Sequence, residues 1–124
     1  MIYLAVALGG ALGALSRFGI GQWLADSGYA HLYPATFLVN VIGALLVGVL
    51  FIGAERFTLS ESARLGMSVG FLGAFTTFSA FSLQLLTDIQ EGQVLRAVFY
   101  ASATVFLCLI SCLVGMELAR SVFD

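Results

Sequence analysis

The chain has 124 residues, of which 60% are hydrophobic and only 10% are charged, and its mean hydropathy is +1.05. An ordinary globular chain carries about 25% charged residues, and a domain this small leaves much of its surface exposed. The composition therefore argues against a soluble globular protein. The basic residues are five scattered arginines and the net charge is −2, so nucleic acid is not expected as a partner, because no basic patch can form.

Four apolar stretches are long enough to cross a membrane, at about residues 2–24, 35–54, 65–87 and 97–116. About 20 helical residues cross a hydrocarbon core of ~30 Å, and backbone groups in lipid must form their hydrogen bonds internally. We therefore predict an all-α membrane protein in which residues 1–124 form a single domain of four transmembrane helices.

Short connections separate the predicted helices. Gly28, His31 and Pro34 indicate a turn in the first connection. In the second connection, Ser60 is among the candidate N-caps of the third helix, and Glu61 lies in the first turn of that helix. No basic residue precedes the first apolar stretch, so we expect a retained helix there rather than a cleaved signal peptide.

The distribution of arginines barely favours one orientation in the membrane. Four helices put both termini and the middle connection on one side, which carries Arg56, Arg64 and Arg120. The other side carries Arg96, together with Arg17 if that side chain reaches the interface. This bias is weak under the positive-inside rule, and it predicts a chain that inserts both ways round.

Two polar residues inside the spans invite a functional interpretation, because polar groups are costly in a membrane. Arg17 follows Gly9 and Gly13, small residues that let another helix approach closely. Its side chain either reaches the lipid headgroups or lines a water-filled vestibule, where its positive field attracts anions. The amide of Asn40 either bonds a neighbouring helix or donates into a pore. The sequence leaves both choices open.

The third span carries the most information. Its segment Gly70–Ser82 is rich in glycine, threonine and serine, which weaken a helix or compete for its backbone hydrogen bonds. Thr76 is the midpoint of the span, so one interpretation is a helix broken near the middle of the bilayer, whose freed carbonyl and N–H groups bind ions. The alternative is an unbroken helix with a glycine face.

Phenylalanines recur along the same span. Phe71, Phe75, Phe78 and Phe81 follow helical spacing, and the usual role of such a stripe is packing. Ring edges carry partial positive charge, however, so phenylalanines that line a pore would also stabilise an anion.

The fourth span carries a weakly polar stripe. Tyr100, Thr104, Cys108 and Cys112 recur every four residues and therefore share one face of a helix. We interpret the two cysteines as packing residues, because a metal site of the usual kind lacks nearby His or further Cys.

Three segments together carry a known pattern: Gly10–Ala14 with Arg17 and Phe18, Thr36–Asn40 with Gly43, and Gly70–Ser82. These segments resemble the Fluc family of small fluoride channels. With four spans and a similar length, the resemblance covers most of the chain. Its most specific part is Gly73–Ser82.

The resemblance implies an antiparallel, dual-topology homodimer in the bacterial plasma (inner) membrane, with two pores that conduct fluoride passively down its electrochemical gradient. It implies that Phe78 and Phe81 line the pores and that Asn40 contacts fluoride. The carbonyls of Gly73 and Thr76, two from each subunit, would hold a structural sodium ion at the dimer centre. The remaining residues expected along the fluoride pathway are Arg17, Thr77, Ser79, Ser82, Tyr100 and Thr104.

The sequence departs from the family pattern at three positions. Cys108 and Cys112 stand where hydroxyl residues are more usual, and Ala80 stands where the family often has threonine. We therefore do not assign these three side chains to ion contact.

Two other functions agree with some of these features. A small drug/proton antiporter is also a short four-span protein, but it needs an ionisable carboxylate inside the membrane, and all seven acidic residues here lie in connections or near span ends. A structural membrane subunit would use the glycine-rich faces for packing, and the composition does not exclude it. An enzyme is not expected, because no catalytic triad or metal-ligand group can be assembled within the spans.

Overall fold

The computed structural model describes residues 1–29 and 34–123, and all regular structure within these ranges is helical. The predicted turn at His31 lies outside the described residues. The elements in chain order are α1 (Ile2–Leu24), the wider π-helical turn η1 (Ala25–Tyr29), α2 (Pro34–Arg56), α3 (Glu61–Leu65), the π-helical η2 (Gly66–Leu72), α4 (Gly73–Phe75), α5 (Ser79–Gln90) and α6 (Val94–Phe123).

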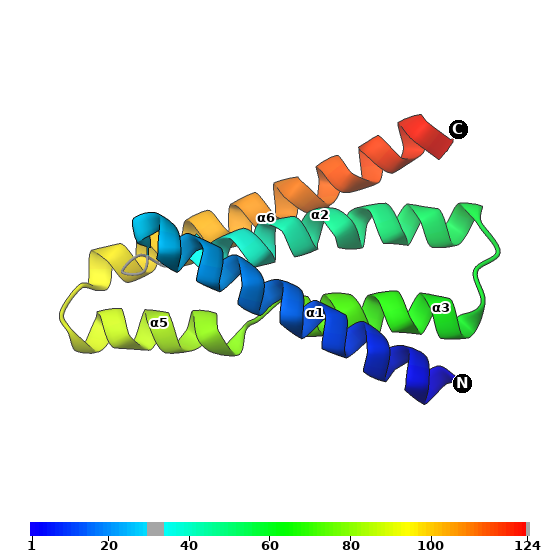
Figure 1. Ribbon diagram of the computed structural model, residues 1–124. Coiled ribbons are helices and arrows are strands. Elements are labelled where there is room, and N and C mark those ends of the chain that lie inside the picture. The colour runs from blue at the N-terminus through cyan, green and yellow to red at the C-terminus, as the bar shows by residue number, and fades with distance from the viewer. Residues whose placement is uncertain (30–33, 124) are drawn as a thin grey trace.

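The helices run back and forth along one axis (Figure 1). Both termini and the connection from α2 to α3 lie at one end of the molecule, and the turn from α5 to α6 lies at the other. The segments long and apolar enough to cross a membrane are Ile2–Tyr29, Pro34–Arg56, Glu61–Gln90 and Val94–Phe123. The prediction of an all-helical, multi-pass membrane protein is therefore confirmed, while the positions at which the spans enter and leave the bilayer stay a prediction.

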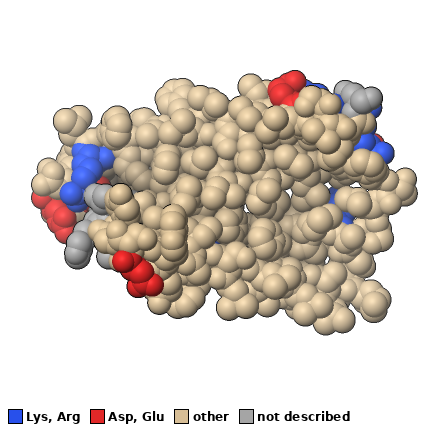
Figure 2. Space-filling model, turned by 45° about the horizontal axis from the view of Figure 1, so that its top comes forward, with Lys and Arg blue, Asp and Glu red and all other residues tan. Residues whose placement is uncertain are grey.

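Charged and apolar side chains are distributed as a membrane requires. On the face seen in Figure 2, charged side chains gather toward the two ends, and apolar and uncharged side chains cover the middle. Large apolar side chains such as Leu12, Phe106 and Leu109 are exposed along the helices. A soluble protein avoids contiguous apolar surface of this kind, whereas lipid or a second protein surface accepts it.

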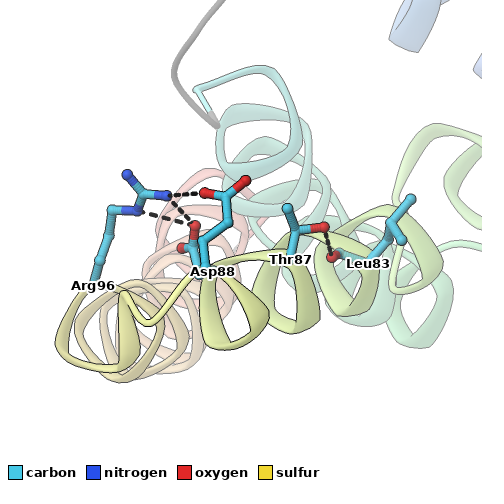
Figure 3. Close-up of polar contacts among 5 residues, drawn as sticks. Leu83, Thr87, Asp88 and Arg96 are labelled. Atoms are coloured by element: carbon cyan, nitrogen blue, oxygen red, sulfur yellow. Dashed lines mark hydrogen bonds and ion pairs between the residues drawn. The ribbon is translucent and has the colours of Figure 1, made fainter.

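Polar side chains form contacts at both ends of the molecule. Ser60 is the N-cap of α3 and accepts a hydrogen bond from the Ala63 backbone N–H at 3.2 Å, as predicted. At the other end, the buried Asp88 of α5 accepts hydrogen bonds from the Arg96 guanidinium of α6, one of them at 3.0 Å from Nε (Figure 3). A buried carboxylate is costly unless it is paired. The pair with Arg96 removes that cost only when α5 and α6 are packed together, and so it stabilises the turn between them.

Glycines allow the helices to touch backbone to backbone. A β carbon built on Gly9 or Gly13 of α1 would lie 2.1 and 2.2 Å from the carbonyl oxygens of Gly66 and Phe71, respectively. One built on Gly115 of α6 would lie 2.2 Å from a carbonyl oxygen of α2. The close approach expected for the glycines of the first span is confirmed, and α2 and α6 also pack backbone to backbone at a glycine.

Gly115→Ala should destabilise the protein by about 1–3 kcal/mol, because the added methyl group forces α2 and α6 apart. Gly19→Ala is the matched control, since a β carbon there meets nothing within 4 Å and alanine favours the helix. Unfolding of both variants in detergent, followed by circular dichroism, measures the difference. Equal stability of the two variants would contradict the packing described for α2 and α6.

Candidate functional site

The third helical segment bends between α4 and α5. Helix α4 ends at Phe75, Thr76 is extended with φ −84° and ψ 158°, and α5 begins at Ser79. In a continuous helix the Thr77 N–H would bond to the Gly73 carbonyl. Here it donates to Oδ1 of Asn40 at 2.9 Å, and Nδ2 of Asn40 donates to the Thr77 carbonyl at 3.0 Å. The unbroken helix considered as an alternative is therefore wrong.

A second pair of contacts completes the bend. The Ala80 N–H, which would bond to the Thr76 carbonyl in a continuous helix, donates instead to Oγ1 of Thr77 at 3.3 Å. The Thr76 carbonyl accepts a hydrogen bond from Nη1 of Arg17 at 3.3 Å. Both polar residues singled out in the first two spans therefore point at the bend, which lies about halfway along the molecule in Figure 1.

Arg17 lines a cavity of about 360 Å³ between α1, α2 and the start of α5. Thr77 and Ser79 also line it, with their hydroxyl oxygens 3.3 Å apart. The positive guanidinium and the N-terminal end of α5 both favour negative charge here. Of the two alternatives for Arg17, the structure supports the one in which the side chain faces a cavity.

A larger cavity of about 490 Å³ lies against α6. It brings together five of the residues predicted for the fluoride pathway, which are Asn40, Thr77, Phe78, Phe81 and Thr104. The lining also contains Thr76, whose carbonyl was predicted as a sodium ligand, together with Cys108 and Cys112. Thr77 lines both cavities, and Asn40, which bonds to the Thr77 backbone, lines the larger one.

The phenylalanines do not form one continuous stripe. The rings of Phe71 and Phe75 stack with centroids 5.6 Å apart, before the bend, while Phe78 and Phe81 contact each other at 5.6 Å after it. The helical spacing assumed for all four rings is therefore wrong, because the bend interrupts the helix between the two pairs. Phe78 is 77% exposed and Phe81 only 6%, so the Phe78 ring is the one that lipid or a second protein could contact.

Three predicted hydroxyl groups have different surroundings. The Tyr100 ring contacts Phe81 at a centroid distance of 5.3 Å. The Ser82 hydroxyl donates to the Phe78 carbonyl at 2.9 Å, and Ser82 is not among the residues that line the two cavities. Thr104 is 6% exposed and lines the larger cavity, and its hydroxyl has no hydrogen-bond partner within the described part of the chain. A buried hydroxyl without a partner costs about 1–3 kcal/mol, which makes Thr104 available to a ligand or a water molecule.

Gln84 lines neither cavity but bonds to two residues beside them, and it was not predicted from the sequence. The Tyr100 hydroxyl donates to Oε1 of Gln84 at 2.9 Å, and Nε2 of Gln84 donates to Oγ1 of Thr36 at 2.9 Å. This chain of hydrogen bonds joins α6, α5 and α2. The available signal was the position of Gln84, an amide three residues after Phe81 and therefore on the same face of α5.

This fold and site define a class of small multi-pass membrane proteins. In this class, a bent helix separates a cavity lined by an arginine from a cavity lined by phenylalanines. The family model described as CrcB-like protein, Camphor Resistance (CrcB), matches residues 4–116. The chain belongs to this family, which confirms the resemblance found in the sequence.

Two relatives illustrate the extent of the similarity. The fluoride-specific ion channel FluC of Pseudomonas fluorescens strain Pf-5 is 41% identical over 120 residues, which cover 96% of this chain and 97% of the relative. A protein of the same name from Thermus thermophilus is 43% identical over 116 residues, covering 94% of this chain and 91% of the relative. Both names describe ion channels, in agreement with the prediction that the chain is not an enzyme.

Asn40→Ala should release the Thr77 backbone and destabilise the bend by about 1–3 kcal/mol. The expected signature is faster hydrogen exchange at the Thr77 amide, together with reduced stability in detergent. Thr87→Val is the control, because within the described part of the chain the Thr87 hydroxyl bonds to its own helix, at 2.9 Å from the Leu83 carbonyl (Figure 3). Unchanged protection of the Thr77 amide in Asn40→Ala would argue against the role given to Asn40.

Proposed function

We propose that the chain is a fluoride-selective channel of the bacterial plasma membrane, through which fluoride leaves the cell down its electrochemical gradient. The observation that carries this proposal is the pair of cavities on either side of the Asn40–Thr77 contact, one lined by Arg17 and the other by Phe78 and Phe81. The names of the relatives support fluoride as the ion.

The lining groups suit a small anion that is strongly hydrated. Arg17 attracts anions to the first cavity, and the Thr77 and Ser79 hydroxyls replace part of the water shell. The Asn40 amide carries two N–H groups, of which one binds the Thr77 carbonyl and the other remains for the ion. The edges of Phe78 and Phe81 add weak electrostatic stabilisation. Several weak contacts allow the ion to be bound and still released.

Thr104 and Tyr100 are proposed to continue the pathway along α6, and Ser82 of α5 is proposed as a further contact. The unpartnered hydroxyl of Thr104 supports its role as a donor. Tyr100 lies one turn earlier on the same helix, against Phe81. Because the Ser82 and Tyr100 hydroxyls both donate within the protein, their contact with fluoride requires those bonds to rearrange.

A second copy of the chain is proposed to complete the pathway as an antiparallel homodimer with two pores. The larger cavity and the exposed ring of Phe78 belong to a surface on which polar and aromatic groups would otherwise meet lipid. The weak arginine bias supports insertion in both orientations, and an isologous two-fold interface then pairs the two chains.

A structural sodium ion at the dimer centre suits the backbone at the bend. The Gly73 carbonyl has lost its helical donor to Asn40, and the Thr76 carbonyl has lost its own to Thr77. Unwound backbone carbonyls are common ligands for sodium in membrane proteins. The Thr76 oxygen also accepts from Arg17, and since a carbonyl has two lone pairs, one remains for a cation.

A drug/proton antiporter is less well supported. Such transport needs an ionisable carboxylate within the membrane. Among residues 1–29 and 34–123, the acid that is fully buried is Asp88, which lies at the turn between α5 and α6 and is paired with Arg96.

Phe78→Ile and Phe81→Ile should each lower fluoride flux by about tenfold or more, because isoleucine keeps the apolar volume but removes the positive ring edge. Phe106→Ile is the matched control, since Phe106 of α6 is 66% exposed and lines neither cavity. The dimer should remain intact in all three variants by size-exclusion chromatography. Normal flux in both pore variants would remove the phenylalanines from the pathway.

Asn40→Asp should also impair flux, because it places negative charge beside a passing anion and removes the donor to the Thr77 carbonyl. Initial fluoride efflux from proteoliposomes at several pH values measures this. Recovery at low pH, where the carboxyl group is protonated, is expected for a charge effect. A rate equal to that of the unaltered protein at neutral pH would exclude Asn40 from the pathway.

Proteoliposomes loaded with potassium fluoride test the proposed function directly. After valinomycin is added, an electrode should record rapid fluoride release, while vesicles loaded with potassium chloride release no chloride. Failure to release either ion, from protein shown to be folded and dimeric, would favour the structural-subunit alternative.

A further inference from the structure

We propose that Cys108 and Cys112 form a binding site for one soft metal ion, such as Hg²⁺ or Cu⁺, on the wall of the larger cavity. Both thiols are free, half-buried and part of the cavity lining. They are four positions apart on α6, so their β carbons lie about 5–6 Å apart on one helix face. Two metal–sulfur bonds of about 2.3 Å, the zinc–thiolate length, together span about 4.6 Å. One ion therefore reaches both sulfur atoms.

The available donors select the kind of metal. Thiolates prefer soft ions. Among the described residues there is no group of three or more His, Cys, Asp or Glu side chains that could hold a metal, so Zn²⁺, which takes four ligands, finds too few here. A soft ion that accepts two ligands in a line needs only the cysteine pair.

The same wall offers a third polar atom. The Thr104 hydroxyl lies one helical turn before Cys108, lines the same cavity and has no hydrogen-bond partner in the part of the chain described. Thr104 is also well shielded, since only 6% of it is exposed. Its oxygen therefore serves as a weak additional contact for an ion held between the two sulfur atoms.

Binding of mercuric chloride would require no oxidant. Each thiol gives up its proton to the buffer, each sulfur forms a bond to mercury, and the two chloride ions leave. The reagent is neutral and enters apolar surroundings, so it reaches the cavity without passing through a pore that selects small anions.

This inference rests on the proposed function in one respect: the metal pair shares its cavity with Asn40, Phe78 and Phe81. The mercury bis-thiolate carries no net charge, but the bound ion fills part of that cavity and so narrows the path open to an anion. Mercuric chloride should therefore inhibit fluoride flux.

Thiol counting tests the site without any measurement of flux. The chain contains two cysteines in total, so about one equivalent of Hg²⁺ per chain should protect both thiols from a chromogenic disulfide reagent, while zinc chloride protects neither. The combined Cys112→Ser and Leu113→Cys variant keeps two thiols but puts them on different helix faces, so it should need about two equivalents. The proposed site would be overturned if the unaltered chain needed two equivalents of Hg²⁺ to protect both thiols. It would also be overturned if one ion were bound per two chains, because the ion would then bridge two chains.

Flux measured with and without mercuric chloride then tests the place of the pair in the pathway. For each protein the readout is the ratio of the two rates, so changes in basal flux cancel. The unaltered chain should be inhibited about tenfold or more, and the Cys108→Ser, Cys112→Ser double variant should not be inhibited. Stoichiometric binding to a chain that never conducts fluoride would sink the proposed function and support the metal site. Full conduction with the ion bound would overturn the placement of the pair beside the pathway.

Discussion

An interrupted helix in an apolar protein must satisfy the backbone groups that the interruption exposes. Each unsatisfied group in lipid costs several kcal/mol. Asn40 directs one N–H and its oxygen at the Thr77 backbone, as a peptide group would, and so replaces the helical bonds that Thr77 has lost. The Arg17 guanidinium likewise donates a hydrogen bond to the Thr76 carbonyl, in place of the helical donor that this carbonyl has lost. Since these two side chains come from α2 and α1, the bend exists only when all three segments are packed together.

The glycine contacts determine whether that packing is possible. Gly13 brings the backbone of α1 against Phe71, one turn before Arg17, and so delivers the guanidinium to the bend. Gly43, one turn after Asn40, leaves room for the Thr76 side chain, since a β carbon there would lie 2.1 Å from the Thr76 methyl group. Helices in lipid associate through close packing and interhelical hydrogen bonds, and here the small residues position the hydrogen-bonding ones.

The sequence could predict the features that depend on local composition. Long apolar stretches fix the four helical segments, and glycine with hydroxyl residues around Thr76 indicates the bend. It could not pair Asn40 with Thr77 or Arg17 with Thr76, because these contacts join residues 37 and 59 positions apart. The prediction of one phenylalanine stripe was wrong for a related reason, because helical spacing places residues on one face only where the helix is uninterrupted.

The hydrogen bonds divide the polar residues of the site into two groups. Gln84 and Tyr100 bond to each other, Gln84 also bonds to Thr36, and these bonds hold α2, α5 and α6 in register. Thr104 has no such partner within the described residues, although it is almost fully buried. A polar group that is expensive to bury and contributes no internal bond is retained most simply for a ligand. The polar stripe of α6 therefore combines a structural end at Tyr100 with a part, from Thr104 onward, that faces the cavity.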